Sequence, residues 1–220
     1  MTKLLILDFD GTLGDTRANI LFTMQQTMRQ MGYPVAGEKE IAATIGLPLE
    51  EGFAKLYPGI SEQEVLTCAT LYREIFDNYR KKLIPSLFPY VKETLSTLKG
   101  EGYVLSIASS RHSDSLNVFL KDMGIAPYIS YVLGANNVTR AKPHPEPVLL
   151  TLDALGFRAD ETLVVGDMPV DIQMGKSAGA KTCAVTYGNA SREELEESGA
   201  DYMIDRFDEI LEILRKVNII

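Results

Sequence analysis

Short apolar runs alternate with amphipathic segments along most of the chain. Each run is bounded by Gly, Asp, Ser or Asn, and its hydrophobic residues are continuous instead of alternating with polar ones. Continuous hydrophobicity is typical of strands that are buried on both faces, as in parallel sheets. The pattern therefore predicts strands at residues 3–7, 103–108, 129–133, 162–165 and 182–186.

The segments between these runs have the periodicity of helices. Strands that alternate with helices predict βαβ units and an open α/β sheet. The expected helices of this part lie roughly at residues 91–99, 113–123, 145–155 and 170–178, and an acidic face on terminal helices is expected after residue 189.

The alternation fails between about Thr16 and Leu83, where the pattern is helical and contains no convincing strand. Ser61 and Glu64 fit a capping box at the start of the last helix of this region. The sequence therefore predicts a core at residues 1–15 and 84–220 and a helical insert at residues 16–83. The expected helices of the insert lie at residues 17–31, 38–43, 49–57 and 61–82.

Composition and charge exclude several classes of protein. A chain of 220 residues suits one large domain, or one domain that carries a smaller insert. Its 30 acidic and 22 basic residues give a net charge of −8. Such a chain lacks the cationic excess that provides non-specific affinity for nucleic acid or anionic lipid. We therefore expect neither a nucleic-acid partner nor a membrane partner.

Cysteine and histidine are too few for a disulfide framework or a closed zinc site. The chain contains Cys68, Cys183, His112 and His144, so any bound metal must be held by oxygen. The apolar run at residues 4–7 is too short for a signal peptide or a membrane span. We expect a cytoplasmic protein that is a monomer or a weak homodimer.

Polar residues follow the predicted strands. In open α/β sheets the reactive site lies beyond the carboxyl ends of the strands, so these residues should meet at one edge. The first strand is followed by two aspartates, the second by serines and an arginine, the third by a lysine and the fourth by an aspartate. The residues expected at this edge are Asp8, Asp10, Ser109, Ser110, Arg111, Lys142, Asp167 and, nearby, Asp171.

Converging carboxylates repel one another and raise one another's pKa. Mg²⁺ relieves this repulsion, because it binds carboxylates, water and phosphate oxygens. A carboxylate beside Mg²⁺ can attack phosphorus and form an aspartyl-phosphate. Lys142 would then neutralise charge on the nucleophile and the phosphoryl group, and Ser109 would donate a hydrogen bond to a phosphoryl oxygen. Asp10 could protonate the leaving oxygen and later activate water.

Four motifs resemble the signatures of the haloacid dehalogenase (HAD) superfamily of phosphohydrolases. They are Asp-Phe-Asp-Gly-Thr at residues 8–12, Ser109 with its preceding strand, Lys142 with the following proline, and Gly-Asp at residues 166–167 with Asp171. Their order and spacing also agree with the superfamily. The resemblance implies a Rossmann-like core, a small helical cap inserted after the first strand, and Mg²⁺-dependent hydrolysis of a phosphate ester.

The resemblance also implies a role for each acidic residue. Asp8 would be the nucleophile and a metal ligand, and Asp10 would be the general acid and base, with its backbone carbonyl on the metal. Asp167 would bind Mg²⁺ directly, and Asp171 would bind it directly or through water. Ser109, Ser110 and Arg17 are the residues expected to bind substrate.

Within the superfamily, the chain is most similar to phosphoglycolate phosphatases and their pyrophosphatase relatives. The similarity rests on the position of the insert, on Gly-Leu-Pro-Leu at residues 46–49, and on Lys-Pro-His-Pro-Glu-Pro at residues 142–147. There are two mild departures. Met168 and Pro169 replace a small polar residue that is often found there, and Arg111 stands where lysine is common.

Several alternatives stay open. Ser109 or Ser110 could cap the next helix, Asp171 could be a surface carboxylate at a helix start, and Arg17 could belong to a solvated helix face. Both histidines are expected to be bystanders. In place of a phosphatase, the motifs would also suit a sugar phosphomutase such as β-phosphoglucomutase, a pyrophosphatase or an idle binding protein. Phosphoglycolate is the first candidate substrate, and pyrophosphate and sugar phosphates are alternatives.

A dehalogenase and a response-regulator receiver are disfavoured. The dehalogenase branch of the superfamily usually lacks the second aspartate, which is present here as Asp10. A receiver is a signalling module without an insert, and its motifs follow in a different order. The length of the chain, the insert and the two aspartates after the first strand all favour the phosphatase.

Overall fold

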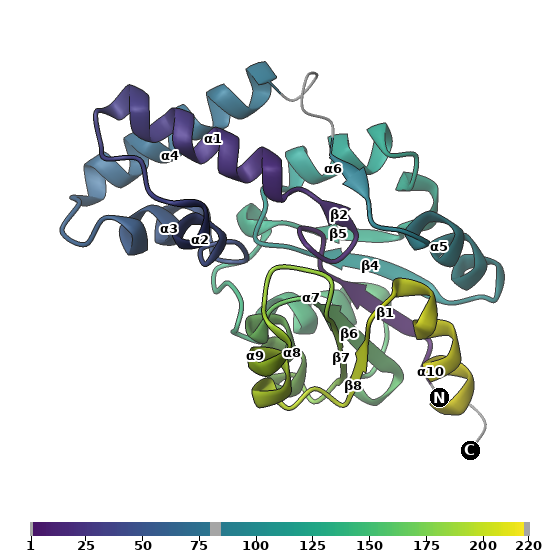
Figure 1. The fold of residues 1–220 in the computed structure, drawn as a ribbon. Coiled ribbons are helices and arrows are strands. Elements are labelled where there is room, and N and C mark those ends of the chain that lie inside the picture. The colour runs from purple at the N-terminus through teal and green to yellow at the C-terminus, as the bar shows by residue number, and fades with distance from the viewer. Residues whose placement is uncertain (1, 80–84, 218–220) are drawn as a thin grey trace.

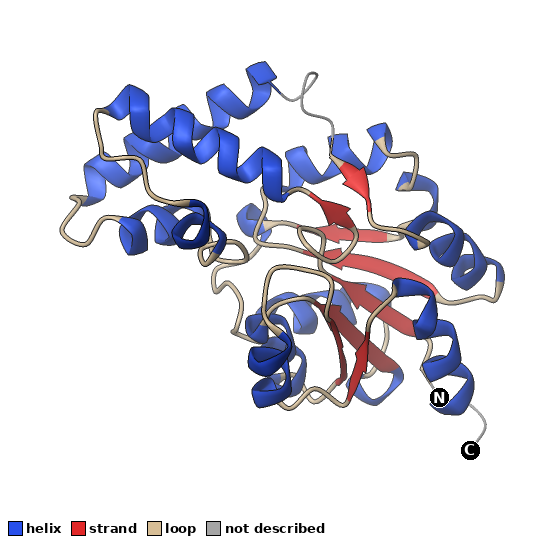
Figure 2. Cartoon of the chain, viewed as in Figure 1, coloured by secondary structure: helices blue, strands red, loops and turns tan. Residues whose placement is uncertain are grey.

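The computed structural model describes residues 2–79 and 85–217 of the chain. At its centre, parallel strands form a six-stranded sheet in the order β5-β4-β1-β6-β7-β8 (Figure 1 and Figure 2). The strands are β1 (Leu4–Leu7), β4 (Val104–Ala108), β5 (Tyr131–Leu133), β6 (Thr162–Gly166), β7 (Lys181–Val185) and β8 (Tyr202–Ile204).

The central strand β1 is completely covered. Leu4, Leu5, Ile6 and Leu7 have 0% exposed surface, because β4 and β6 flank the strand and helices cover both faces. Leu5 pairs in register with Leu105 of β4 and Leu163 of β6. The unbroken apolar sequence of β1 is therefore the one that a doubly covered parallel strand requires.

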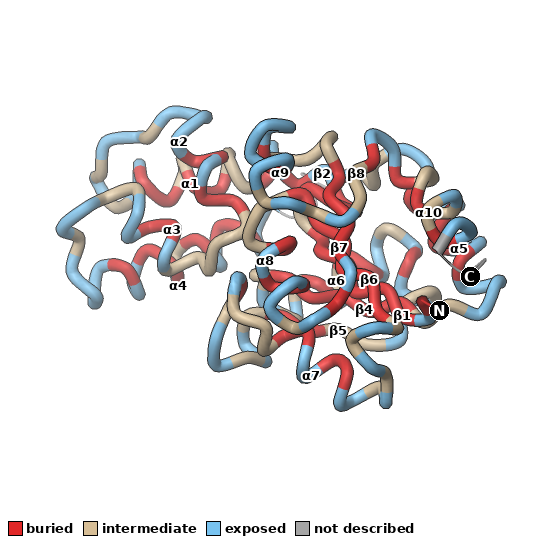
Figure 3. Tube along the Cα trace, turned by 90° about the horizontal axis from the view of Figure 1, so that it is seen from below, coloured by how far each residue is buried: buried red, intermediate tan, exposed pale blue. Residues whose placement is uncertain are grey.

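Helices cover the two faces of the sheet, so the core has three layers. Leu5 and Leu7 point toward one set of helices, and Leu4 and Ile6 point toward the other. Figure 3 shows long buried stretches in the strands between these layers, and buried segments that alternate with exposed ones along the helices. The first set is α5 (Val91–Gly100), α6 (Ser113–Asp122) and α10 (Ile210–Val217), and the second is α7 (Glu146–Leu155), α8 (Pro169–Ser177) and α9 (Arg192–Ser198).

The remaining helices form a separate group, here called the helical unit. Figure 1 shows this group beyond the carboxyl ends of the parallel strands. Within it, α1 and α3 pack against α4 around Phe53 and Met28, which are almost completely buried. The helical unit consists of α1 (Arg17–Met31), α2 (Glu38–Ala42), α3 (Leu49–Leu56) and α4 (Glu62–Tyr79).

Two short strands connect the helical unit to the core. β2 (Gly14–Asp15) precedes α1, and β3 (Ser86–Leu87) follows the helical unit and pairs with β2 in the antiparallel direction. The division into domains at residues 15/16 stays a prediction. The predicted boundary at 83/84 and the last residues of the predicted helix 61–82 lie outside the described residues.

The predicted elements of the core and of the helical unit are confirmed, with small shifts at their ends. Helix α1 has the predicted bounds, and the capping box before α4 is present. The Ser61 hydroxyl accepts a hydrogen bond from the Glu64 backbone N–H (3.3 Å), and the Glu64 carboxylate accepts one from the Ser61 N–H (3.1 Å).

Three short strands are absent from the sequence prediction. β2 and β3 are two residues long, too short to produce a hydrophobic pattern. β8 has three residues at the edge of the sheet, and only Ile204 among them is buried. Short 3₁₀ helices, which were also not predicted, occupy Ala126–Tyr128, Ala135–Asn137, Ala159–Glu161 and Phe207–Glu209.

Helix α8 can approach the sheet closely because of Gly175. A Cβ atom at Gly175 would lie 2.7 Å from Thr182 and 2.9 Å from Val164. We therefore expect Gly175→Ala to lower the free energy of unfolding by about 1–3 kcal/mol in urea titrations, since the added methyl group overpacks the core. The matched control is Gly100→Ala in α5, where a Cβ would meet nothing within 4 Å. That control should be neutral or stabilising by up to about 1 kcal/mol, and equal effects of the two substitutions would contradict this account.

Candidate active site

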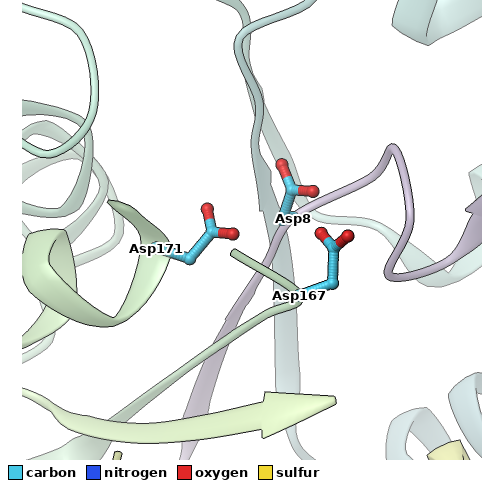
Figure 4. Close-up of side chains that lie close together, drawn as sticks. All are labelled: Asp8, Asp167 and Asp171. Atoms are coloured by element: carbon cyan, nitrogen blue, oxygen red, sulfur yellow. The ribbon is translucent and has the colours of Figure 1, made fainter. Parts of the chain in front are cut away.

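Three carboxylates lie together beyond the carboxyl ends of β1 and β6. Asp8 follows β1, Asp167 follows β6, and Asp171 lies in the first turn of α8. One carboxylate oxygen of each residue lies within 4.8 Å of the others, and all three residues are buried. Figure 4 shows the three side chains converging from separate segments of the chain. The parallel sheet thus brings together three carboxylates that are far apart in the sequence.

The backbone approaches Asp167 so closely at Gly11 and at Gly188 that only glycine fits at these two positions. A Cβ at Gly11, where φ is +92°, would lie 2.1 Å from Oδ2 of Asp167. A Cβ at Gly188 would lie 2.3 Å from the Cβ of Asp167. Larger side chains would push Asp167 out of the cluster.

A buried lysine neutralises part of the charge. Nζ of Lys142 donates hydrogen bonds to Oδ1 of Asp8 and to Oδ1 of Asp171, both at 2.6 Å. The Lys142 side chain is only 4% exposed. Burial acts to lower the pKa of Lys142, but the Asp171 and Asp8 carboxylates outweigh it and raise this pKa above its ordinary value. Lys142 therefore stays protonated.

One lysine does not balance three carboxylates. Burial, and after it the Asp171 and Asp167 charges, raise the pKa of Asp8 well above its ordinary value despite the attraction of Lys142. Burial and the Asp171 charge raise the pKa of Asp167 to about 7. An additional cation would reduce the repulsion among the three carboxylates. Because all of the donor atoms are oxygens, the set fits a hard divalent metal ion. The cluster is therefore suited to metal binding.

Two residues that the sequence analysis did not select hold Asp167. The backbone N–H and the Nδ2 of Asn189 donate hydrogen bonds of 2.7 and 2.9 Å to Oδ2 of Asp167, and the Thr12 hydroxyl lies 3.3 Å from Oδ1. Asn189 follows β7, which ends at Val185. The rule that polar residues beyond strand ends form the site therefore applies to Asn189 as well.

Asp10 lies outside the carboxylate cluster. Its Oδ1 accepts hydrogen bonds from Thr16 Oγ1 (2.6 Å) and from Nη2 of Arg111 (2.7 Å), and its Oδ2 accepts one from Nε of Arg111 (3.0 Å). Strand β1 ends at Leu7, so Asp10 belongs to the segment that follows the strand. Asp8 and Asp10 nevertheless line the same cavity.

The two predicted substrate-binding serines make different contacts. Oγ of Ser109 accepts a hydrogen bond from the Arg111 backbone N–H (3.2 Å), whereas the Ser110 hydroxyl donates one to the Gly46 carbonyl (2.7 Å). The second bond joins the core to the helical unit. Neither serine caps α6, because His112 occupies the N-cap and its side chain accepts from the Asp114 N–H.

A cavity of about 870 Å³ lies between the helical unit and the core. Asp8, Asp10, Ser109 and Ser110 line it, whereas the predicted substrate-binding residue Arg17 is exposed at the start of α1 and is not in its wall. Apolar side chains contribute much of the wall from both sides. These are Ile20, Met24, Ile45, Leu47, Leu49 and Phe76 from the helical unit, and Val118 and Phe119 from α6.

Comparison with known proteins agrees with this fold. Residues 5–185 match the model of the haloacid dehalogenase-like hydrolase family. The chain belongs to this family, and it is a hydrolase of the phosphatase type. The resemblance noted in the four motifs is thereby confirmed.

Particular relatives extend over nearly the whole chain. A probable phosphatase, IndB, from Dickeya dadantii is 37% identical, with 96% of this chain and 93% of IndB covered. A phosphoglycolate phosphatase from Pectobacterium atrosepticum is 32% identical (96% and 91% covered). The pyrophosphatase PpaX from Bacillus mycoides is 30% identical (97% of each chain).

A solved structure described as a predicted phosphoglycolate phosphatase, from Haemophilus somnus, superposes on the chain with a TM-score of 0.87. It is 27% identical, with 97% of this chain and 98% of that one covered. The fold of core and helical unit is therefore shared over nearly the whole length of that protein.

Among the described residues, no helix has the length and apolar character needed to cross a membrane.

The charge imbalance predicts a pH-dependent stability in the absence of metal. The pKa of Asp167 rises from 3.8 to about 7 on folding, so between these values the folded chain binds more protons than the unfolded chain. Stability must then fall as the pH rises through this range. We expect the melting temperature of the chelated protein to fall as the pH rises from about 4 to about 8. In Asp167→Asn the melting temperature should fall less over this range. Added Mg²⁺ should raise the melting temperature of the wild type more than that of the variant.

The control for this measurement is Asp153→Asn on the exposed side of α7, which should follow the wild-type curve. A pH dependence of Asp167→Asn that matches the wild type would show that this carboxylate does not carry the effect.

Proposed function

We propose that the protein is a Mg²⁺-dependent phosphatase that hydrolyses a small phosphate monoester through an aspartyl-phosphate on Asp8. The observation that carries the proposal is the position of Asp8. It lies at the end of β1, beside Asp167 and Asp171, with Oδ1 on the Lys142 ammonium group and the side chain at the wall of the cavity.

In the first step, an oxygen of Asp8 attacks phosphorus and the bond between phosphorus and the leaving oxygen breaks. Lys142 limits the repulsion between the carboxylate and the phosphoryl group, because its ammonium group already contacts Asp8. The Ser109 hydroxyl, on the same wall, donates a hydrogen bond to a phosphoryl oxygen. The carboxyl group of Asp10 gives its proton to the leaving oxygen, which departs as an alcohol.

In the second step, the Asp10 carboxylate takes a proton from water as the water attacks phosphorus. The bond between Asp8 and phosphorus breaks, and inorganic phosphate leaves. Asp10 ends the cycle with the proton that it held at the start, so the net reaction consumes one water per ester.

Asp8 and Asp167 are the side chains that would hold Mg²⁺. When bound, this ion would neutralise phosphoryl charge and orient the ester for in-line attack. Asp171 is less available to the metal, because its Oδ1 contacts Lys142 and its Oδ2 accepts from the Met168 N–H (3.1 Å). We therefore assign Asp171 a contact through water and a second role in positioning Lys142.

Phosphoglycolate is the first candidate substrate, supported by relatives that are named phosphoglycolate phosphatases. Pyrophosphate is the second, since other relatives are named PpaX pyrophosphatases. A sugar phosphomutase is disfavoured by residues 46–49, which face the cavity and are apolar apart from their backbone. The expected ligand is thus a small phosphorylated metabolite.

Asp8→Asn tests the covalent mechanism. Asparagine keeps the shape of the side chain but removes the attacking charge, so kcat should fall by roughly three or more orders of magnitude. Acid quenching of the wild type during turnover of ³²P-labelled ester should leave label on Asp8, as peptide mapping would show. The exposed Asp153→Asn serves as control. Turnover of Asp8→Asn near the wild-type value would refute the proposal.

The apolar wall of the helical unit should select the leaving group. Leu49→Ala should change kcat/KM unequally across phosphoglycolate, pyrophosphate and sugar phosphates, by roughly tenfold or more where the leaving group contacts the wall. Leu66→Ala, on the exposed side of α4, is the matched control and should leave all values unchanged. If β-glucose 1-phosphate gave glucose 6-phosphate faster than free phosphate, the protein would be a mutase instead.

A further inference from the structure

Arg111 occupies an unusual position in the cavity wall. Its Nε and Nη2 donate to both oxygens of Asp10, at 2.7–3.2 Å, and its Nη1 lies 3.3 Å from the Ser115 hydroxyl. The side chains of Arg111 and Asp10 are 10% and 12% exposed. The guanidinium group therefore forms a bidentate salt bridge with the Asp10 carboxylate, and both side chains are largely shielded from water.

Two aromatic rings contact this guanidinium group. The Arg111 Cζ lies 5.1 Å from the ring centre of Phe76 in α4 and 5.0 Å from that of Phe119 in α6. The two rings also contact each other edge to face, with centres 5.5 Å apart. The position of Arg111 thus depends on both the helical unit and the core, and cation–π attraction stabilises its charge away from water.

Among the residues that the structure describes, two arginines line the cavity, and they differ in their surroundings. Arg73 pairs with Glu50 at 2.6 Å, but both side chains are exposed, at 48% and 37%. Water screens such a pair strongly. Arg111 is the buried one, and it is close enough to Asp8 for that carboxylate to help raise its pKa. The Asp10 carboxylate now occupies the donor side of the Arg111 guanidinium group. An anionic group attached to the leaving oxygen could bind Arg111 at this place.

We propose that Arg111 is the specificity residue for a phosphate monoester whose alcohol portion carries a carboxylate. The substrate carboxylate replaces Asp10 on the guanidinium group. The released Asp10 carboxylate takes up a proton from solvent and is then free to turn toward the leaving oxygen as the acid. One carboxylate exchanges for another, so the charge around Arg111 is conserved. An ester without this group leaves Asp10 on Arg111 and reacts slowly. This inference rests on the proposed phosphatase function and deepens it.

The test compares phosphoglycolate with 2-hydroxyethyl phosphate, which has the same two-carbon chain but a hydroxymethyl group in place of the carboxylate. Wild-type kcat/KM should favour phosphoglycolate by at least about tenfold. Arg111→Gln should lower kcat/KM for phosphoglycolate on the order of 100-fold, since a buried charge partner is lost. For 2-hydroxyethyl phosphate the same variant should change kcat/KM less than about threefold, or raise it, because Asp10 is no longer held.

Two further variants separate recognition from structural damage. Arg111→Lys retains the charge but not the fork, so it should recover part of the preference for phosphoglycolate. Arg73→Gln should affect both esters to the same extent. If Arg111→Gln lowered kcat/KM equally for both esters, or if Arg111→Lys recovered nothing, the recognition role would be refuted.

A binding measurement covers the case in which Arg111→Gln fails to fold. Phosphoglycolate should bind to Asp8→Asn more tightly than 2-hydroxyethyl phosphate, and a crystal structure of that complex should show the ligand carboxylate on Arg111 with Asp10 displaced. A complex in which Asp10 still contacts Arg111 would overturn the inference while leaving the phosphatase function intact. If the wild type hydrolysed neither ester, the proposed substrate class would fail, and the inference with it.

Discussion

The site depends on one buried ammonium group. Nζ of Lys142 lies 2.6 Å from Oδ1 of Asp8 and from Oδ1 of Asp171. One oxygen of each of the three buried carboxylates lies within 4.8 Å of the others, and without Lys142 no ammonium group would oppose their repulsion. A buried cation of this kind does not make the fold more stable than an apolar core would. Its value is functional, since its charge opposes the rise that burial causes in the pKa of Asp8, and its hydrogen bond holds that side chain in place. The remaining excess of negative charge is what makes the site suitable for a metal ion and a phosphoryl group.

The second constraint connects the two parts of the chain. Phe9, Phe119, Phe76, Tyr72 and Phe53 form a continuous series of ring contacts from the end of β1 into the helical unit. Arg111 lies against the middle of this series and holds Asp10. Any movement of the helical unit relative to the core must therefore change the surroundings of Arg111. In the proposed function, this coupling places recognition of the leaving group and control of Asp10 in the same few side chains.

Much of the fold was predictable because burial leaves a strong pattern. The apolar run of β1 and the periodicity of α1 both have local causes, and both were located correctly. β2 and β3 were missed because two residues carry no period. β8 lies at the sheet edge, and its strand geometry comes from its partner β7. The site residues Asp8, Lys142, Asp167 and Asp171 could be selected because parallel strands all deliver their carboxyl ends to one edge.

Other features were decided only by the tertiary structure. Asn189 reaches Asp167 because β7 lies next to β6, an order of strands that the sequence does not state. Arg17, at the predicted helix start, is exposed and is not part of the cavity wall, whereas Arg111 lines the cavity and pairs with Asp10. The sequence by itself determined which chemical groups are available and the edge at which they gather, since both follow from local pattern. Which of these groups pair with one another was decided by packing, because pairing depends on distances between segments that are far apart in the chain.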